Sequence, residues 1–440
     1  MEVLIKTAQF LLSLSILIVI HEWGHFLFAR LFGIRVEKFY LFFNPWFSLF
    51  KIRRGETEYG MGWLPLGGYV KISGMIDESM DKEQMKQEPK PYEFRSKPAW
   101  QRLLVMIGGV LFNVILAALI YVFMLFFMGD EYLPVENMTY GIEAGLLGKE
   151  IGLENGDHIV AINGEEPDDL LSLRRSFARG EVEVITVRRN DRIIDLDIPD
   201  DFFGKLIAAR GEDFISVRFP FIVSGFVDGS AAKEAGVQTG DHVKGIGGIE
   251  TWSFNEFLAT IGDFAGMETT LIIARNGETF ELPISIPEEG RIGAYIKDPN
   301  DIFETSKREY SLLASVPAGF SRAYTTTRDY FRDLGLLFRP EVSARDNLGG
   351  FITIGGIFAP QWDWVHFWTI TAFLSIILAV MNILPIPALD GGHVMFLFYE
   401  MIVGKKPPDK FMEYAQMVGM IILLSLILLV NINDVLRLFR

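Results

Sequence analysis

Four long apolar stretches constrain this chain more than any other feature of its sequence. They cover residues 5–31, 103–128, 364–386 and 415–432. Each is close to or above the roughly 20 residues that a helix needs to cross the hydrocarbon core of a bilayer. Because backbone polar groups in lipid must be satisfied within their own segment, these stretches predict four transmembrane helices.

The first apolar stretch carries the sequence His21-Glu22-Trp23-Gly24-His25. Two imidazoles and a carboxylate are costly inside hydrocarbon and usually mark a functional site. On a helix, His21 and His25 lie four residues apart and share a face, which is the spacing of two zinc ligands with Glu22 as the general base. A chance match, with both histidines simply packed, is the alternative interpretation. The motif therefore predicts a zinc hydrolase centre inside the membrane.

A catalytic zinc site usually has three protein ligands and one open position, so a third ligand is needed. The third apolar stretch ends, over residues 382–393, in Asn-Ile-Leu-Pro-Ile-Pro-Ala-Leu-Asp-Gly-Gly-His. Pro385 and Pro387 cannot continue a regular helix, and unwound backbone at membrane depth is tolerated where it lines a cavity. We predict Asp390 as the third ligand. His393 is the rival ligand, and an exposed Asp-Gly turn is the alternative without metal.

Charge and cysteine content exclude other classes of function. The formal net charge of −15 argues against nucleic-acid binding. The chain has no cysteine, which excludes disulfides and thiolate metal sites. Lysine and arginine are concentrated in residues 30–102 and 405–410, so the positive-inside rule places these segments in the cytoplasm. Residues 129–363 and both termini then lie outside, and the metal site lies in the bilayer toward its cytoplasmic face.

The long segment between the second and third apolar stretches contains an internal repeat. Residues 149–159 (KEIGLENGDHI) match residues 233–243 (KEAGVQTGDHV) at an offset of 84. Each copy combines a short helix, a glycine turn, Gly-Asp and an apolar strand, and each closes with a strand-like alternation. This pattern looks like the core of bacterial PDZ domains, which bind extended peptides and peptide termini by adding a strand. We expect two α+β PDZ domains in tandem, at residues 129–212 and 213–290.

Three further segments are expected to lie at or in the membrane. Residues 56–76 are apolar and glycine-rich, and predict a β-hairpin that dips into the membrane beside the metal; a peripheral hairpin is the alternative. Residues 307–338, in a linker at 291–362, predict an amphipathic interfacial helix, with a plain soluble helix as the alternative. Residues 108–113 of the second stretch combine glycines with Asn113, which indicates helix packing or a role near the site. The charged residues 77–91 predict a loop.

In this order, the features resemble the site-2 protease family of intramembrane zinc metalloproteases, in its bacterial regulator-of-sigma-E branch. The resemblance covers essentially the whole chain and depends on HExxH in the first span, a glycine-rich hairpin, tandem PDZ domains and Asn-x-x-Pro-x-Pro-x-Leu-Asp-Gly in the third span. It implies the following residue roles: His21, His25 and Asp390 bind Zn²⁺, Glu22 is the catalytic acid and base, and Asn382, Pro385, Gly67, Gly68 and Tyr69 contact the substrate.

The resemblance also implies an organisation and an activity. The implied fold is an α-helical membrane protein in the bacterial inner membrane with periplasmic PDZ domains. The expected substrates are single-span membrane proteins, namely an anti-sigma factor and remnant signal peptides, and the PDZ pair filters them by size or by binding. A membrane-anchored PDZ scaffold without proteolytic activity is the main alternative, and a metal transporter is a weaker one. The expected segments outside the PDZ pair are 1–35 (first span), 36–102 (cytoplasmic, with the hairpin), 103–128 (second span), 363–393 (third span) and 394–440 (cytoplasmic turn and fourth span).

Overall fold

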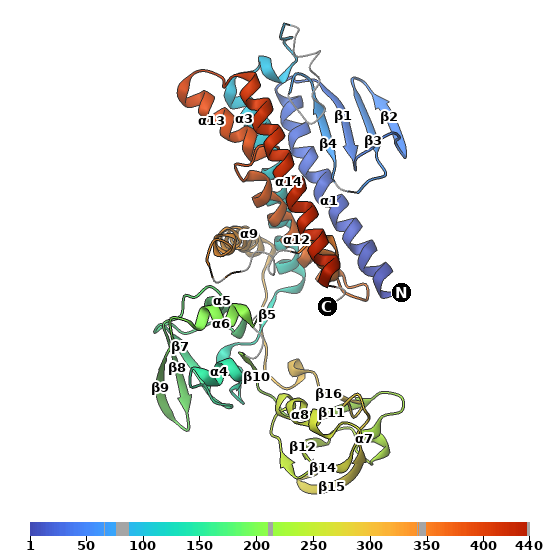
Figure 1. Cartoon of the computed structure of the whole chain (residues 1–440), viewed down its shortest axis with the longest axis vertical. Helices are drawn as coiled ribbons and strands as arrows, with labels where there is room; N and C mark the ends of the chain where they lie inside the picture. Colours follow the sequence, from blue (N-terminus) through green and yellow to red (C-terminus); the bar gives the residue numbers. More distant parts are fainter. Residues whose placement is uncertain (66, 76–87, 210–213, 341, 343–348, 438–440) are drawn as a thin grey trace. The chain divides into compact units, whose positions relative to one another are not determined.

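The computed structural model of the chain forms two compact units (Figure 1). Unit 1 comprises residues 1–129, 309–339 and 343–440, and unit 2 comprises residues 130–308 and 340–342. The structure describes residues 1–65, 67–75, 88–209, 214–340, 342 and 349–437. Most of the charged loop predicted at 77–91 therefore lies outside the described residues.

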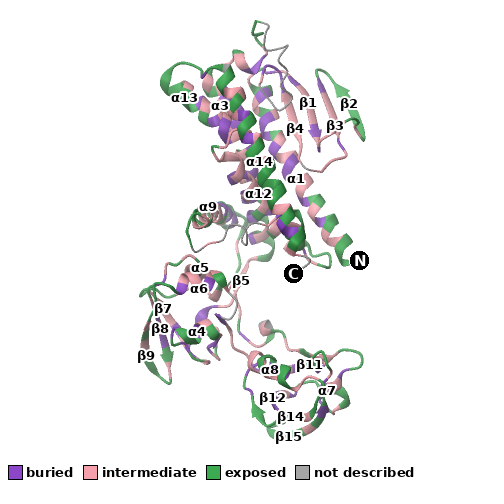
Figure 2. Ribbon diagram, viewed as in Figure 1, coloured by how far each residue is buried: buried purple, intermediate pink, exposed green. Residues whose placement is uncertain are grey.

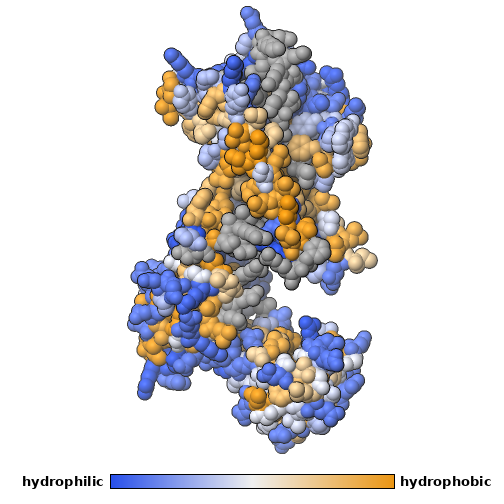
Figure 3. All heavy atoms as spheres, in the orientation of Figure 1, coloured by the Kyte–Doolittle hydropathy of each residue, from blue (hydrophilic) through white to orange (hydrophobic). Residues whose placement is uncertain are grey.

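Among the residues that the structure describes, four helices of unit 1 are long and apolar enough to cross a membrane. By length and composition, they confirm the four predicted spans. Figure 3 shows hydrophobic residues along the visible face of this helical region and a mainly hydrophilic surface on unit 2. Only 11% of the apolar window of the last helix is buried in the protein, so its remaining apolar side chains need a lipid environment. The four helices are α1 (Glu2–Leu31), α3 (Ala99–Met128), α12 (Trp364–Ile383) and α14 (Asp409–Arg437).

Helix α3 occupies the centre of the helical bundle. It contacts α1, α12, α9 (Leu312–Leu336) and α13 (Asp390–Val403). Buried residues gather inside this bundle, whereas much of α14 is exposed (Figure 2). A Cβ atom on Gly24 of α1 would lie 2.2 Å from the carbonyl oxygen of Gly108 on α3. The two backbones therefore touch, and only small residues allow helices in a membrane to approach so closely.

Two predicted segments of unit 1 differ in extent from the structure. Helix α12 ends at Ile383, earlier than predicted, because Pro385 follows and disfavours helical backbone just before it. Asp390 begins the separate helix α13 and is not part of the third span. The predicted amphipathic helix at 307–338 is present as α9, which buries Ser315, Gly319 and Ala323.

A four-stranded sheet follows α1 and differs from the predicted hairpin. Its strand order is β2-β3-β1-β4, and β1 pairs in parallel with β3 and antiparallel with β4. The two strands that form within residues 56–76 therefore do not pair with each other, since β1 lies between them. Local periodicity predicts strands but not such non-local pairing. The strands are β1 (Val36–Leu41), β2 (Phe50–Arg54), β3 (Thr57–Met61) and β4 (Tyr69–Ile72).

Unit 2 contains two modules, each with its own hydrophobic core. The module boundaries differ from the predicted ones because β10 pairs with β6 in the first module and β16 pairs with β11 in the second. A further strand pair joins β5 (Asp130–Tyr132) to β17 (Ser306–Arg308). The first module comprises β6 (Ile142–Ala144), α4 (Leu146–Glu150), β7 (His158–Ile162), α5 (Leu170–Ala178), β8 (Val184–Arg189), β9 (Arg192–Asp197), α6 (Phe202–Ala208) and β10 (Ile215–Val217). The second comprises β11 (Phe221–Phe226), α7 (Ala231–Glu234), β12 (His242–Ile246), β13 (Ile249–Glu250), α8 (Phe254–Ile261), β14 (Glu268–Arg275), β15 (Glu278–Ser285) and β16 (Ala294–Ile296).

The Gly-Asp element of the sequence repeat closes both modules in the same way. Arg189 donates from Nε and Nη2 to the two carboxylate oxygens of Asp157, both at 2.7 Å. Arg275 makes the same two bonds to Asp241, also at 2.7 Å. Both aspartates are 1% exposed. Bidentate charge-assisted bonds of this kind are strong and directional, so each aspartate fastens its glycine turn to the last residue of a more distant strand, β8 in the first module and β14 in the second.

Asp241→Asn is expected to lower amide-exchange protection of β12 and β14 by about 10- to 100-fold at neutral pH, since a hydrogen bond to a charged group contributes about 1.5–3 kcal/mol. Burial raises the pKa of Asp241, but Arg275 and the backbone N–H of Gln238 outweigh burial and hold this pKa below its ordinary value of 3.8. The stabilisation is therefore present above pH 3.8 and is lost as the pH falls through the folded-state value. Hydrogen exchange measured by mass spectrometry checks this, with the first module as the internal control. Equal protection of the second module in variant and wild type would contradict it.

Candidate metal centre

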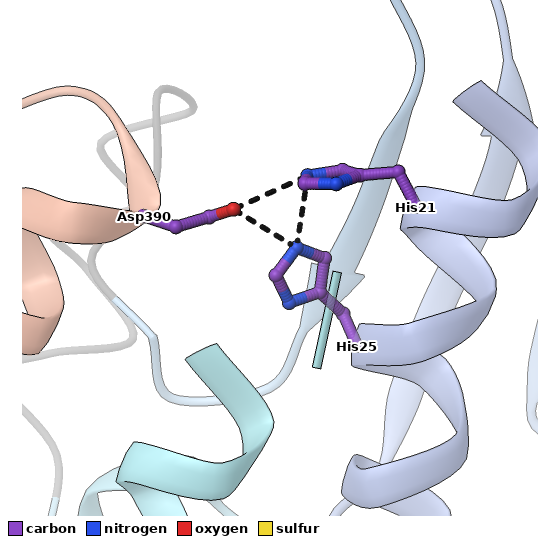
Figure 4. A group of neighbouring side chains, drawn as sticks. All are labelled: His21, His25 and Asp390. Atoms are coloured by element: carbon purple, nitrogen blue, oxygen red, sulfur yellow. Dashed lines mark hydrogen bonds and ion pairs between the residues drawn. The ribbon is translucent and has the colours of Figure 1, made fainter. Parts of the chain in front are cut away.

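His21, His25 and Asp390 converge on one point in unit 1 (Figure 4). The Nε2 atoms of the two histidines are 3.3 Å apart. Oδ2 of Asp390 lies 3.2 Å from Nε2 of His21 and 3.4 Å from Nε2 of His25. Ligand atoms bound to zinc at 2.0–2.1 Å with tetrahedral angles stand about 3.3 Å apart. The three side chains therefore form a triangle of the size that a zinc ion requires.

Local sequence explains how the three side chains reach this point. His21 and His25 share one face of α1 because they are four residues apart. Asp390 arrives from the other side, as the first residue of α13 after the proline-containing loop. A Cβ on Gly391 would lie 2.1 Å from the carbonyl oxygen of Leu384, so the Asp-Gly sequence turns tightly against the end of α12.

The chemistry of the three facing atoms fits a cation. Oδ2 of Asp390 is buried and accepts no hydrogen bond from the residues that the structure describes. Nδ1 of His25 donates to the carbonyl oxygen of Val105 at 2.8 Å, which leaves the lone pair of the neutral ring on Nε2. Lone pairs that converge without protons repel one another unless a positive ion lies between them. Two imidazoles and one carboxylate are a ligand set typical of catalytic zinc.

Glu22 and the strand β4 meet beside the metal cluster. Glu22 lines a cavity of about 370 Å³ together with His21, His25 and Asp390. Gly68 lines it too, and a Cβ at this position would lie 2.5 Å from Cγ2 of Ile18 and 2.7 Å from the carbonyl oxygen of Tyr40. Only glycine fits there, and its absence of a side chain allows the start of β4 to approach α1 next to Glu22.

The other residues predicted to contact the substrate lie at different distances from the metal cluster and its cavity. Tyr69 lines the cavity and donates its hydroxyl to Oδ1 of Asn44 at 2.9 Å. Nδ2 of Asn382 lies 3.5 Å from Nε2 of His21. Pro385 is exposed in the loop after α12, and neither it nor Gly67 lines the cavity.

His393, the rival ligand, lines the same cavity but does not belong to the metal cluster found among the described residues. Three residues contact the metal-cluster histidines or line the cavity, but the sequence analysis gave them no specific role. The backbone carbonyl of Val105 could not have been found from the sequence. Asn113 and Gln416 are polar residues buried in apolar helices, and a polar residue in an apolar helix is a signal that sequence reasoning can detect. Gln416 of α14 lines the cavity.

Gly109→Ala is expected to weaken zinc binding by about 10-fold or more. This is the loss in affinity that typically follows when a residue that orients a metal ligand is changed. A Cβ on Gly109 of α3 would lie 2.5 Å from Nε2 of His25 and 2.6 Å from Cε1 of His21, so the rings or the helix must shift. Competition with a chromophoric chelator measures the affinity. Gly355→Ala in α11 (Phe351–Gly356) is the matched control, because no other segment of the described chain lies within 4 Å of the added Cβ. Unchanged zinc affinity in Gly109→Ala would show that the rings have room.

A bundle of apolar helices with an HExxH helix in it defines the class of membrane metalloproteases. A family model described as peptidase family M50 matches residues 9–426. The chain therefore belongs to peptidase family M50 and is a site-2-type metalloprotease, which confirms the family and the enzyme class predicted from the sequence.

Curated relatives agree with this assignment over their full length. The chain is 28% identical to a regulator of sigma E protease of Haemophilus influenzae, with 100% of both chains covered. It is 29% identical to the regulator of sigma-E protease RseP of Escherichia coli, with 98% of both covered. It is 26% identical to a candidate zinc metalloprotease of Ralstonia nicotianae, with 99% of both covered.

Proposed function

We propose that this protein is an intramembrane zinc metalloprotease that hydrolyses peptide bonds within the membrane-spanning segments of single-span substrates. The observation that carries the proposal is the triangle of His21, His25 and Asp390, with sides of 3.2–3.4 Å, among helices apolar enough to cross a membrane. The zinc metalloprotease name of a relative supports Zn²⁺ as the ion. The names of the regulator of sigma-E relatives support an anti-sigma factor as one substrate, and remnant signal peptides share its single-span form.

His21, His25 and Asp390 would hold the zinc ion, and Glu22 would carry the proton. Bound zinc supplies Lewis acidity to a water molecule and to the scissile carbonyl. Glu22 lines the same cavity, so its carboxylate accepts the proton of the attacking water and returns it to the leaving amine. His21 and His25 are buried, and electrostatic interactions are stronger where water is excluded.

The strand β4 supports a mode of substrate binding. A transmembrane substrate is helical, so its carbonyls are already hydrogen-bonded and must be released before attack. β4 is an edge strand of its sheet, and all four of its residues, from Tyr69 to Ile72, line the cavity. An unwound substrate would add to this edge and exchange helix hydrogen bonds for strand hydrogen bonds. Gly67, Gly68 and Tyr69 would then seat the backbone, and Asn382 and Pro385 would contact it from the end of α12.

The two modules of unit 2 would act as tandem PDZ domains that filter substrates by size or by binding a peptide end. The basic residues of the 30–102 segment support a cytoplasmic position for it. Unit 2 would then lie in the periplasm and the metal near the cytoplasmic face of the inner membrane. A membrane-anchored PDZ scaffold without activity is not favoured, because every position of the HExxH motif is filled and its two histidines meet Asp390.

Metal analysis of the purified protein, paired with cleavage of a single-span substrate in proteoliposomes, tests the proposal. We expect about one zinc per chain and a cut within the apolar segment of the substrate. Removing a bulky outer domain from the substrate should raise the cleavage rate if unit 2 filters by size. A protein that holds no zinc and leaves every single-span substrate intact would favour the scaffold.

A further inference from the structure

Asn113 is completely buried in α3, with its side-chain amide against the ring of His21. Nδ2 of Asn113 lies 3.3 Å from Nδ1 of His21, and Oδ1 of Asn113 has no hydrogen-bond partner within the described part of the chain. The oxygen and nitrogen of an amide exchange places by a half turn about the Cβ–Cγ bond. Asn113 can therefore present either a donor or an acceptor to this histidine.

Binding of zinc by His21 would determine whether its outer ring nitrogen needs a donor or an acceptor from Asn113. Nε2 is the ring atom that faces His25 and Asp390, so it is the atom that would donate its lone pair to zinc. A neutral imidazole that binds through Nε2 carries its proton on Nδ1. That N–H needs an acceptor, because a buried donor without a partner costs about 1–3 kcal/mol. The Asn113 amide is the group placed to receive it.

The other histidine shows the same arrangement with a different acceptor. Nδ1 of His25 donates to the backbone carbonyl of Val105, also on α3. Val105, Gly109 and Asn113 follow one another at four-residue intervals, so α3 presents them on one face. That face meets the two histidines of α1. Val105 and Asn113 lie at its two ends, each beside the Nδ1 atom of one histidine. Gly109 lies between them, and its lack of a side chain leaves room for the two rings.

We propose that Asn113 is a positioning residue whose side-chain carbonyl accepts the Nδ1–H of His21 and so holds Nε2 of His21 as a zinc ligand. The proposal rests on the zinc site of the proposed function. Helix packing supports it, because Ser375 of α12 donates to the backbone carbonyl of Asn113 at 2.8 Å and is itself fully buried. The backbone of Asn113 is thus held by α12 independently of its side-chain amide.

Zinc affinity of the full-length protein, measured by competition with a chelator, tests the proposal. Asn113→Leu keeps the volume and removes the acceptor, and we expect zinc to bind about 10- to 100-fold more weakly. Asn113→Asp keeps an acceptor in the same place, and we expect an affinity within about threefold of wild type. The matched control is Gln9→Leu, since Gln9 is another fully buried amide of the bundle and bonds the carbonyl of Ala359 away from the site. We expect it to leave zinc affinity unchanged.

Wild-type affinity in Asn113→Leu would overturn the proposal, and so would an equal loss in Asn113→Leu and Asn113→Asp, which would indicate packing alone. Cobalt-loaded Asn113→Asp gives a second readout that does not depend on the leucine variant folding. A visible absorption band like that of the wild type supports the proposal, and a shifted band overturns it. Absence of zinc from the wild type itself would instead refute the proposed function, so the two failures are distinguishable.

Discussion

Glu22→Gln is expected to lower the rate of peptide cleavage by about 10²- to 10⁴-fold, the usual contribution of a positioned general base. Zinc content should stay at the wild-type level, because the three side chains of the metal cluster do not include Glu22. Glutamine keeps the size and polarity of the side chain but cannot accept the proton of the attacking water. Cleavage of a single-span substrate in proteoliposomes, together with zinc stoichiometry, measures both effects.

The control for this substitution is Glu56→Gln, at the turn between β2 and β3, where the carboxylate lies 3.7 Å from Arg30. We expect this variant to cleave at the wild-type rate, since Glu56 is exposed. Wild-type cleavage by Glu22→Gln would exclude Glu22 as the general base. Simultaneous loss of zinc in Glu22→Gln would mean that Glu22 acts on the metal and not on the proton.

Asp390→Asn is expected to weaken zinc binding by more than about 100-fold. Loss of a residue that only hydrogen-bonds to a metal ligand costs roughly 10- to 100-fold in affinity, and loss of a ligand itself should cost more. The substitution removes the only carboxylate of the metal cluster in the described chain and replaces a negative ligand by a neutral one. Zinc would then be held by His21 and His25 alone, and cleavage should fall in parallel. Competition with a chelator gives the affinity, and metal analysis gives the occupancy.

His393→Ala is the matched control for Asp390→Asn. His393 lines the same cavity and lies one turn further along α13, but it is not part of the metal cluster. We expect this variant to keep the zinc affinity of the wild type. The reverse pattern, with zinc retained in Asp390→Asn and lost in His393→Ala, would make His393 the third ligand.

The spans and the motif residues could be predicted from the sequence because both depend on local properties. A helix in lipid must be apolar over its whole length, so composition alone locates α1, α3, α12 and α14. Helical periodicity alone places His21 and His25 on one face. The repeat was visible because the same Gly-Asp turn closes each module through an arginine, at Asp157 and at Asp241.

Strand pairing and module boundaries could not be predicted in this way. β1 inserts between β3 and β4, and β10 and β16 join modules beyond the boundaries expected at 212 and 290. An alternating pattern shows that a segment forms a strand and which face is buried, but it holds no information on the partner strand. Pairing between distant segments depends on tertiary packing.

The sequence by itself determined that this chain has four membrane-length helices, two histidines on one helix face and an aspartate after a proline-interrupted span. Only the tertiary structure decided that the aspartate meets the histidines and that α3 supplies Val105 and Asn113 to their outer nitrogens. The physical reason is that hydrophobic periodicity specifies which face of a helix is buried, whereas the atoms that meet there depend on how closely the helices approach. At Gly24 and Gly108, backbone touches backbone, and that contact brings the face of α3 to the histidines.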